Sequence, residues 1–436
     1  MTKKLSFPSI VSLVIGSQIG SGVFLLPSSL ATVGPISLFG CFFSGLGAIF
    51  LALVFAKLSM TVSNKGGGPH IYVERAFGRK AAFFTAWTYW LVSWISSLAV
   101  IIAAVGYLSS LINIPSSLLL LGAELIIIIA VTMLNMKGIT AAGKFEIMLT
   151  GIKCLPLIIV PVAGLIALNF ENLTPLNPNN LSIFSALNKA SLMTFWGFIG
   201  IEMATTTAGV AENPSKTIPK AILLGTSFVI LVYLLSSVAI MGVIPQSILE
   251  KTNAPYAIAT QIIFGQGWDF IIAALAFVAC IGTLNAWVLT SGQIAFEASK
   301  DGLFPPIFSK TNKYGAPSVS LVITLIISMF LLVLTLTPNI LEQMNMIIDL
   351  SVMTFLLVYL ISAAALIKII VKEKLKKSRI YLAISIAGGL FCVWVLAFDS
   401  LFHLLFCSLF VVSGTPVYLL QQKRWSATQK EILEKM

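Results

Sequence analysis

The sequence predicts an all-α membrane protein with twelve transmembrane helices. Of its 436 residues, 58% are hydrophobic and only 10% are charged, whereas soluble domains are about a quarter charged. Apolar stretches long enough to cross a hydrocarbon core of about 30 Å as helices recur along the chain. We place these spans at 9–31, 36–60, 82–111, 117–135, 146–168, 187–210, 220–244, 269–296, 317–336, 346–371, 380–398 and 402–420.

Lysine and arginine predict the orientation of the spans. Cytoplasmic loops carry an excess of these residues, and all but three of the 27 fall on one side of the twelve-span arrangement. Lys189 and Lys251 lie on the other side, and Lys153 lies within a span. We therefore expect both termini in the cytoplasm. Because the net charge of +11 is dispersed over these loops, nucleic acid is not an expected partner and lipid phosphates are.

The chain is expected to form one transmembrane domain over 1–420, followed by a cytoplasmic tail over 421–436. The first and sixth spans each contain a polar, glycine-containing interruption, so that spans one to five align with spans six to ten. An odd number of spans makes the two halves, about 9–168 and 187–371, inverted in the membrane. Such inverted repeats with broken helices are typical of secondary transporters. The extra helices over 380–420 lie outside the repeat.

The Gly-Ser-Gly run at 20–22 predicts a helix break within the first span. Glycine weakens a helix interior by about 1 kcal/mol relative to alanine, and broken backbone in a bilayer is tolerated where it lines a cavity. We expect a half-helix to begin at Val23 and its free N–H groups to bind a substrate carboxylate. The second break, near 198–200, offers carbonyls to an ammonium group. Close packing of small residues is the alternative interpretation.

Ionisable residues within apolar spans are functional candidates. Glu202 follows the second break and can bind a cation or proton and act as a gate, or remain a protonated, hydrogen-bonded glutamate. The ammonium of Lys153 can replace a sodium ion on carbonyls of the broken first span, or carry a proton, unless it snorkels to the headgroups. Asp349, in the tenth span, can face the same cavity, whereas Glu124 is expected to be structural.

Two tryptophans, Trp196 and Trp287, lie in the sixth and eighth spans at depths where interfacial aromatic belts are not expected. An aromatic face at that depth can stack on a cation or close over a substrate. Filling of the core is the alternative for each of them.

Five stretches of the sequence occur in an informative order: IGSGVFLLP at 19–27, GGGPHIYVERAFG at 66–78, TYWLVSWISSLAVIIAAVGYL at 88–108, FWGFIGIEMATTTAGVAENPSKTIPKAI at 195–222 and DGLFPPIFSKTNKYGAP at 301–317. Together they resemble the amino acid–polyamine–organocation superfamily over about residues 7–420, in particular the bacterial basic amino acid/polyamine antiporters. The resemblance implies a LeuT-type five-plus-five inverted repeat with broken first and sixth helices. It also implies alternating access and a place in the bacterial inner membrane.

The same resemblance implies roles for individual residues. Ser97 and Ser17 stand where the arginine/agmatine exchanger has asparagines, so the contact to a substrate side chain stays open. Lys153 resembles the fifth-span lysine of proton-coupled amino acid transporters. The implied substrate-binding residues are Ile19, Gly20, Ser21, Gly22, Ser93, Ser97, Trp196, Ile199, Trp287 and Ser351, and the implied gating or proton-handling residues are Tyr89, Glu202, Tyr359 and Lys153.

We therefore expect a secondary active transporter that exchanges a cationic amino acid, such as arginine or ornithine, for a related amine or amino acid. A proton-coupled amino acid symporter that uses Lys153 is the alternative, and a membrane-embedded enzyme or a channel is less favoured. His70 and His403 are far apart and the sequence has no metal-ligand cluster, so no catalysis, cofactor or metal is expected. The expected partners are a small amino acid or polyamine and membrane lipid, with a homodimer left open.

Overall fold

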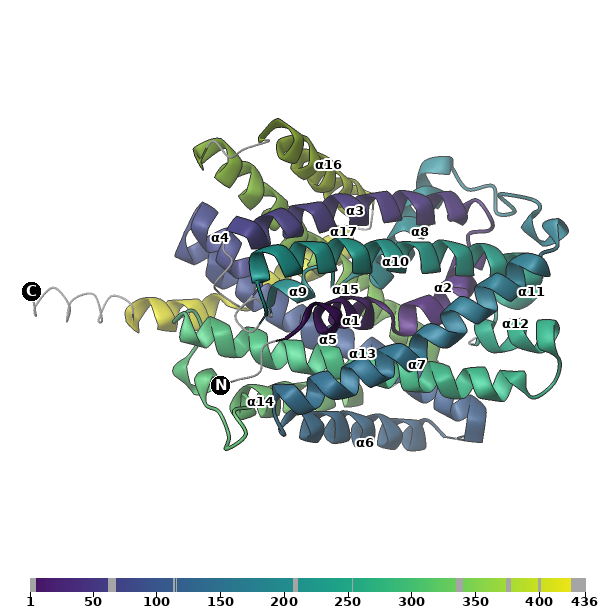
Figure 1. The fold of residues 1–436 in the computed structure, drawn as a ribbon, viewed down its shortest axis with the longest axis horizontal. Helices are drawn as coiled ribbons and strands as arrows, with labels where there is room; N and C mark the ends of the chain where they lie inside the picture. The colour runs from purple at the N-terminus through teal and green to yellow at the C-terminus, as the bar shows by residue number, and fades with distance from the viewer. Residues whose placement is uncertain are drawn as a thin grey trace, which may run out of the picture.

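The computed structural model describes residues 5–61, 68–112, 114, 116–206, 211–252, 254–334, 340–373, 378–398 and 401–424. Within these ranges the chain is almost entirely helical, and the β-type pairing consists of one isolated bridge between Leu5 and Ala211 (Figure 1). Ten helical segments of the described chain are long and apolar enough to cross a membrane. The all-α membrane fold predicted from the sequence is therefore confirmed.

Most helices run along the long axis of the molecule (Figure 1). Their bounds are α1 Phe7–Gln18, α2 Ser21–Ala31, α3 Ser37–Thr61, α4 Pro69–Phe77, α5 Arg79–Ile112, α6 Ser117–Asn135, α7 Ile139–Ile166, α8 Ile183–Phe195, α9 Met203–Thr206, α10 Pro214–Val243, α11 Gln246–Leu249, α12 Pro255–Phe264, α13 Trp268–Lys300, α14 Ser318–Leu334, α15 Ile340–Glu373, α16 Ser378–Ala397 and α17 Leu401–Val412. The described residues also form short 3₁₀ turns, η1 Phe170–Leu173, η2 Trp196–Phe198 and η4 Pro306–Ser309.

The predicted spans correspond to these helices with shifts at their ends. Besides the ten long segments, α14 occupies the ninth predicted span and the broken series α8, η2 and α9 occupies the sixth. The helix α7 begins at Ile139, before the predicted start at 146. The last helical segment turns at 413–414 and continues to 424, beyond the predicted end at 420.

Among the helices that the structure adds between the predicted spans, α4 and α12 share a sequence pattern. Each begins with a proline, Pro69 or Pro255, and each ends at a glycine with positive φ, Gly78 at +85° and Gly265 at +94°. Proline suits the first turn because it lacks an N–H, and glycine takes the left-handed conformation after the last turn. A proline and a glycine about ten residues apart therefore bracket a short helix here.

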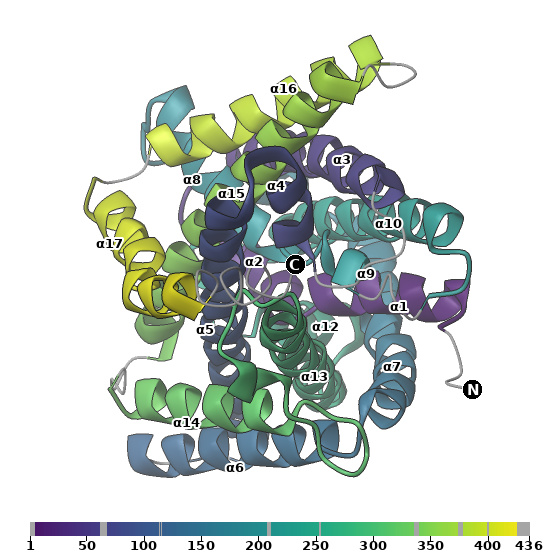
Figure 2. The same cartoon turned by 90° about the vertical axis from the view of Figure 1, so that its left-hand side faces the viewer.

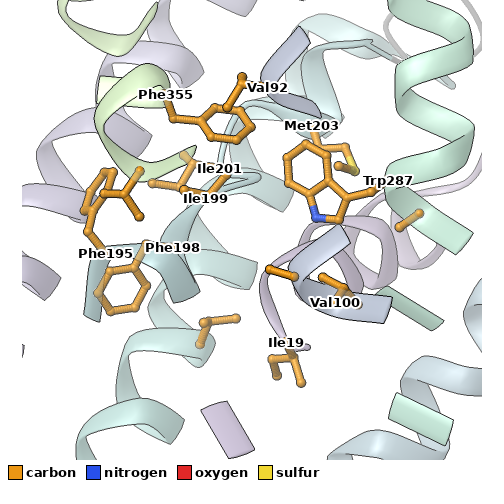
Figure 3. Packing of buried hydrophobic residues seen from close by; sticks show 14 of the residues in the cluster. Ile19, Val92, Val100, Phe195, Phe198, Ile199, Ile201, Met203, Trp287 and Phe355 are labelled. Carbon is orange, nitrogen blue, oxygen red and sulfur yellow. The ribbon is translucent and has the colours of Figure 1, made fainter. Parts of the chain in front are cut away.

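The centre of the bundle is formed by the first span together with α5 and α13 (Figure 2). Of the most apolar window of the first span, 72% is buried inside the protein, against 11% for the segment His403–Arg424. The outer helices expose large apolar side chains, for example Leu118, Ile126, Leu390 and Leu409. A surface of this kind suits contact with lipid. Figure 3 shows part of the buried core, with Phe195 and Phe198 on one side and Trp287 on the other.

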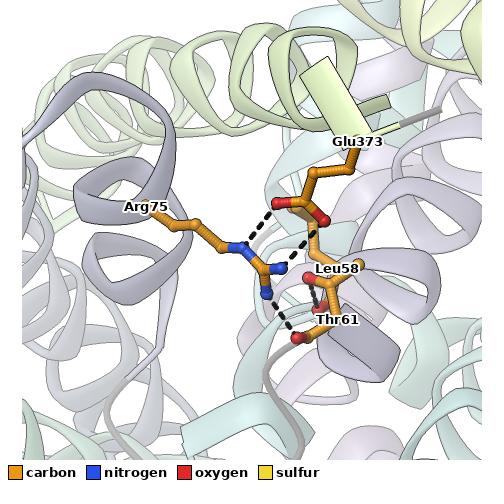
Figure 4. A network of polar contacts seen from close by, with 4 residues as sticks. All are labelled: Leu58, Thr61, Arg75 and Glu373. Carbon is orange, nitrogen blue, oxygen red and sulfur yellow. Dashed lines mark hydrogen bonds and ion pairs between the residues drawn. The ribbon is translucent and has the colours of Figure 1, made fainter. Parts of the chain in front are cut away.

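One end of the bundle is held by a polar network around Arg75 of α4 (Figure 4). Its guanidinium donates two parallel hydrogen bonds to Glu373 of α15, at 3.0 and 2.8 Å, and a third to the carbonyl of Thr61 at the end of α3, at 2.6 Å. Exposed ion pairs contribute about 0–1 kcal/mol, but the paired geometry is specific. The network therefore fixes where α4 lies more than it adds to stability.

Close contact between α3 and α8 holds the first half of the broken sixth span. A Cβ placed on Gly40 would lie 2.5 Å from the Cβ of Ala190 and 3.0 Å from the carbonyl oxygen of Leu187. Hydroxyls link the two backbones in both directions, because Ser191 donates to the carbonyl of Gly40 and Ser44 donates to the carbonyl of Ser191. Small residues that allow such an approach are typical of helix contacts in membranes.

We predict that Gly40→Ala destabilises the protein by about 1–3 kcal/mol, the usual cost of overpacking a close contact. The added methyl meets a Cβ and backbone, which cannot rotate away. The measurement is the unfolding temperature of purified protein in detergent, which should fall by several degrees. Gly122→Ala is the matched control because nothing lies within 4 Å of a Cβ at that helical position. Equal unfolding temperatures for the two variants would contradict the prediction.

Candidate functional site

The first span is broken at Ile19 and Gly20. Helix α1 ends at Gln18 and α2 begins at Ser21, with Ile19 in an extended conformation and Gly20 directly before α2. A Cβ on Gly20 would lie 2.6 Å from Thr283, so glycine is required by the close approach of α13. The expectation that the new half-helix begins at Val23 is wrong by two residues. Gly20 takes the position before the helix, where glycine is well tolerated, and Ser21 and Gly22 form its first turn.

The second break lies in the sixth span, where the sequence predicts it. Helix α8 ends at Phe195, one 3₁₀ turn follows, and the backbone is extended at Ile199 before α9 begins at Met203. Gly200 has a φ of +107°, a conformation that favours glycine. The hydroxyl of Ser17 in α1 lies 2.9 Å from the carbonyl oxygen of Val14 and 3.4 Å from that of Gly200, so α1 and the second break are in contact.

Donors from neighbouring helices satisfy the carbonyls at the end of α1. The Lys153 ammonium, which is buried in α7, donates to the carbonyl of Gly16 at 2.6 Å and lies 3.3 Å from the Thr283 hydroxyl. Thr283 of α13 lies 2.6 Å from the carbonyl oxygen of Ile19, to which it donates. The ammonium of Lys153 thus lies on a carbonyl of the broken first span and is fully buried.

Tyr233 of α10 connects the two broken spans. Its hydroxyl donates to the carbonyl of Gln18 at 3.1 Å, and its ring packs on Gly197, where a Cβ would lie 2.2 Å from the ring. Gly22 is equally confined, since a Cβ there would lie 2.9 Å from the Trp196 ring and 3.0 Å from the Tyr233 hydroxyl. The glycines therefore let both breaks approach one tyrosine.

Two cavities adjoin the breaks. The first is small, with about 20 Å³ of space for the centre of a water molecule, and is lined by Ser17, Gln18, Gly20, Ser21, Gly22, Val100, Trp196, Gly197, Ile199, Thr283 and Trp287. The second has about 150 Å³ of such space and is lined by Ser21, Gly22, Leu25, Leu26, Ser29, Thr32, Met193, Trp196, Ile348 and Asp349. Because Ser21, Gly22 and Trp196 line both, the indole of Trp196 and the first turn of α2 lie between the two cavities.

The first cavity contains polar groups without protein partners. The hydroxyl of Ser21 and the carbonyl oxygen of the Gln18 side chain are buried and have no hydrogen-bond partner among the described residues. Beside them, the N–H groups of the first turn of α2 have no acceptor within their own helix. Buried polar groups are normally paired, so this arrangement is suited to a polar ligand, and the positive end of the helix dipole favours an anionic group.

Glu202 lies at the second break in a fully buried cluster of hydroxyls. Its carboxylate accepts a hydrogen bond from Tyr89 of α5 at 2.8 Å and a shorter one from Tyr359 of α15. The Tyr359 hydroxyl in turn accepts from the backbone N–H of Gly200 at 3.3 Å. Phe355 lies between this cluster and Trp287, with ring centroids 6.0 Å from Tyr359 and 5.4 Å from Trp287. The cluster therefore joins the second break to α5 and α15, and the Phe355 ring separates it from Trp287.

Several residues singled out in the sequence lie outside the linings of both cavities. Ser93 and Ser97 donate to carbonyls of their own helix, at 2.7 and 3.1 Å, and Ser351 is buried without a partner within the described ranges. Ile19 is buried and contributes its carbonyl to Thr283. Glu124 is buried in α6.

The sequence analysis missed several residues of the site, among them Gln18, Thr283, Tyr233 and Phe355. Thr283 precedes Trp287 by one helical turn, a spacing that places both on one face of α13. Phe355 likewise lies one turn from Ser351 and from Tyr359. No signal in the sequence distinguishes Tyr233 from the other aromatic residues within the apolar spans.

In the described part of the chain, no group of three or more His, Cys, Asp or Glu residues could hold a metal ion.

Known proteins are similar to this chain along almost its entire length. The family described as amino acid permease matches residues 5–423. The chain is 30% identical over 439 residues to the putrescine transporter PotE of Escherichia coli strain K12, covering 98% of each chain. It is 29% identical to a putative arginine/ornithine antiporter of Bacillus subtilis strain 168, over 87% of this chain and 88% of that protein.

A third relative is the cadaverine/lysine antiporter of Escherichia coli strain K12, with 30% identity over 77% of this chain and 76% of that protein. The family match extends across both broken spans and includes every helix that surrounds the two cavities. The chain is therefore a multi-pass membrane protein that belongs to the amino acid permease family, within the amino acid–polyamine–organocation superfamily.

Proposed function

We propose that the protein is a secondary transporter that exchanges a cationic amino acid, such as arginine or ornithine, for a related amine or amino acid by alternating access. The observation that carries this proposal is the first cavity, where the first turn of α2 and the unpartnered hydroxyl of Ser21 meet the tryptophans Trp196 and Trp287. The helix terminus suits the substrate carboxylate, and the aromatic faces suit its cationic or aliphatic part.

The relatives support exchange as the mode of transport. Two of them are named antiporters, for arginine and ornithine or for cadaverine and lysine, and a third is named a putrescine transporter. Each named pair or substrate is a cationic amino acid or a diamine. The proposal places this chain in the bacterial inner membrane with both termini in the cytoplasm. It also assigns the inverted repeats to about 9–168 and 187–371.

In this mechanism the substrate binds between the two breaks and Trp196 closes over it. In the proposed movement Glu202 separates from Tyr89 of α5 or Tyr359 of α15, which bind it in this structure. The bound substrate favours that movement through its differential affinity for the two states. Obligatory exchange follows if the empty protein reorients slowly.

We predict that labelled ornithine or arginine enters proteoliposomes only when an amine or amino acid substrate is loaded inside. The measurement is counterflow into liposomes that contain the purified protein, with liposomes lacking protein as the control. Uptake into an empty lumen driven by a pH gradient would contradict strict exchange.

We predict that Gly22→Ala weakens ornithine or arginine binding by at least about tenfold, while the protein stays folded. The methyl enters the space of the Trp196 ring and the Tyr233 hydroxyl, next to the proposed carboxylate site. Binding is measured by ligand-induced thermal stabilisation, which reports affinity by mass action. Gly151→Ala is the control because a Cβ there meets nothing within 4 Å. Unchanged binding in the Gly22 variant would remove the first turn of α2 from the substrate site.

A proton-coupled symporter is the second candidate, and the contact between Lys153 and the carbonyl of Gly16 favours it. If loss of a proton from Lys153 weakens its hydrogen bond to the Gly16 carbonyl, the end of α1 loses a supporting contact. Protonation of Lys153 would in this way be linked to the substrate site.

If Lys153 couples protons to transport, Lys153→Ala and Lys153→Gln should abolish uptake driven by a pH gradient and leave counterflow intact. Glutamine is the more conservative change, because its amide can still donate to the Gly16 carbonyl and cannot carry a proton. The measurement is uptake with and without a gradient in the same liposome preparation. Gradient dependence that persists in both variants would remove Lys153 from the coupling role.

A further inference from the structure

Asp349 of α15 lines the second cavity, together with the first turn of α2 and the Trp196 ring. This cavity extends along α2 as far as Thr32, just beyond the last residue of that helix. An occupant would therefore lie between Asp349 and Trp196, on the far side of the indole from the first cavity.

Asp349 is the one ionisable side chain among the described residues that line this cavity. The other walls are mostly apolar, formed by Leu25, Leu26, Met193 and Ile348. A carboxylate against apolar walls interacts more strongly with a cation than it would in bulk water. An acid inside a membrane-spanning segment is a functional candidate on the same grounds. The electrostatics of the second cavity therefore favour positive ligands.

The α2 side of the same cavity has complementary chemistry. Ser21 and Gly22 provide the first N–H groups of α2, and the Ser21 hydroxyl has no partner within the described structure. A ligand with a carboxylate at one end and a cation at the other can engage both the helix terminus and Asp349. A neutral amino acid of the same length can engage only the helix terminus.

We infer that Asp349 binds the distal cation of the substrate in the second cavity and thereby selects cationic over neutral amino acids before Trp196 moves. This inference rests on the proposed function and names a specificity-determining residue for it. The Asp349 side chain also interacts within the protein, so the arriving cation adds to that contact or replaces it.

Arginine and citrulline provide the test because they have nearly the same shape and differ in side-chain charge. In proteoliposomes, each is measured as a competitor of labelled arginine exchange, and the ratio of their half-inhibitory concentrations gives the charge preference. Asp349→Asn should lower this preference by at least about tenfold, mainly through weaker arginine binding. Asp349→Glu, which keeps the charge, should retain most of it.

Glu171→Gln is the matched control, since it removes an exposed acid at the same end of the molecule. That end is shared because Asn179, in the same loop, donates to the carbonyl of Thr32 at 2.8 Å. The control should leave the preference unchanged. Asp349→Ser is a second neutral variant, which keeps the test decisive if the asparagine variant does not fold.

An unchanged preference in either neutral variant that still exchanges arginine would overturn the role of Asp349. A loss of preference in the glutamine control equal to that in the neutral Asp349 variants would also overturn it, because the effect would then be a general surface potential. Absence of any amine or cationic amino acid exchange in the unmodified protein would instead refute the proposed function. The two failures are therefore distinguishable.

Discussion

The satisfaction of three backbone carbonyls at the end of α1 is the constraint on which the site depends. In a bilayer, carbonyls released from a helix find no water and must be paired by the protein. Three helices supply the donors: Lys153 of α7 to Gly16, Tyr233 of α10 to Gln18 and Thr283 of α13 to Ile19. Each unpaired carbonyl would cost about 1–3 kcal/mol, so the break persists because the surrounding bundle pairs it.

This arrangement also positions the second break. Tyr233 fixes the end of α1 and packs on Gly197, and Ser17 of α1 reaches the carbonyl of Gly200. A change in the support of α1 is therefore transmitted directly to the sixth span. The first turn of α2 and the Trp196 ring lie where the two breaks meet, which is why they line both cavities. Substrate binding at this point can act on both broken spans together.

The sequence predicted where the helices break and which charged residues lie within the spans. It did not predict which side chains pair with the groups at the breaks. The breaks were predictable because glycine within an apolar span is unfavourable unless the backbone has another use, and Lys153 was predictable as a buried cation that needs carbonyls. Thr283 and Tyr233 were not, since a single Thr or Tyr in an apolar helix is common and its partner depends on tertiary packing. For the same reason Ser93 bonds to its own helix, which residue type and spacing could not determine.

The two sides of the substrate site differ in a way that bears on exchange. On one side the Trp196 ring and the first turn of α2 separate the first cavity from the larger second cavity. On the other side lie the Phe355 ring and the buried bonds from Tyr89 and Tyr359 to Glu202. Opening that side breaks the bonds from the two tyrosine hydroxyls to the Glu202 carboxylate. These groups are costly to leave unpaired unless water or another partner replaces the bonds. A ligand shifts an equilibrium only by its differential affinity for the two states. A substrate that binds the opened state more tightly therefore offsets the free-energy cost of opening. In the empty protein nothing offsets that cost, so the opened state is less populated.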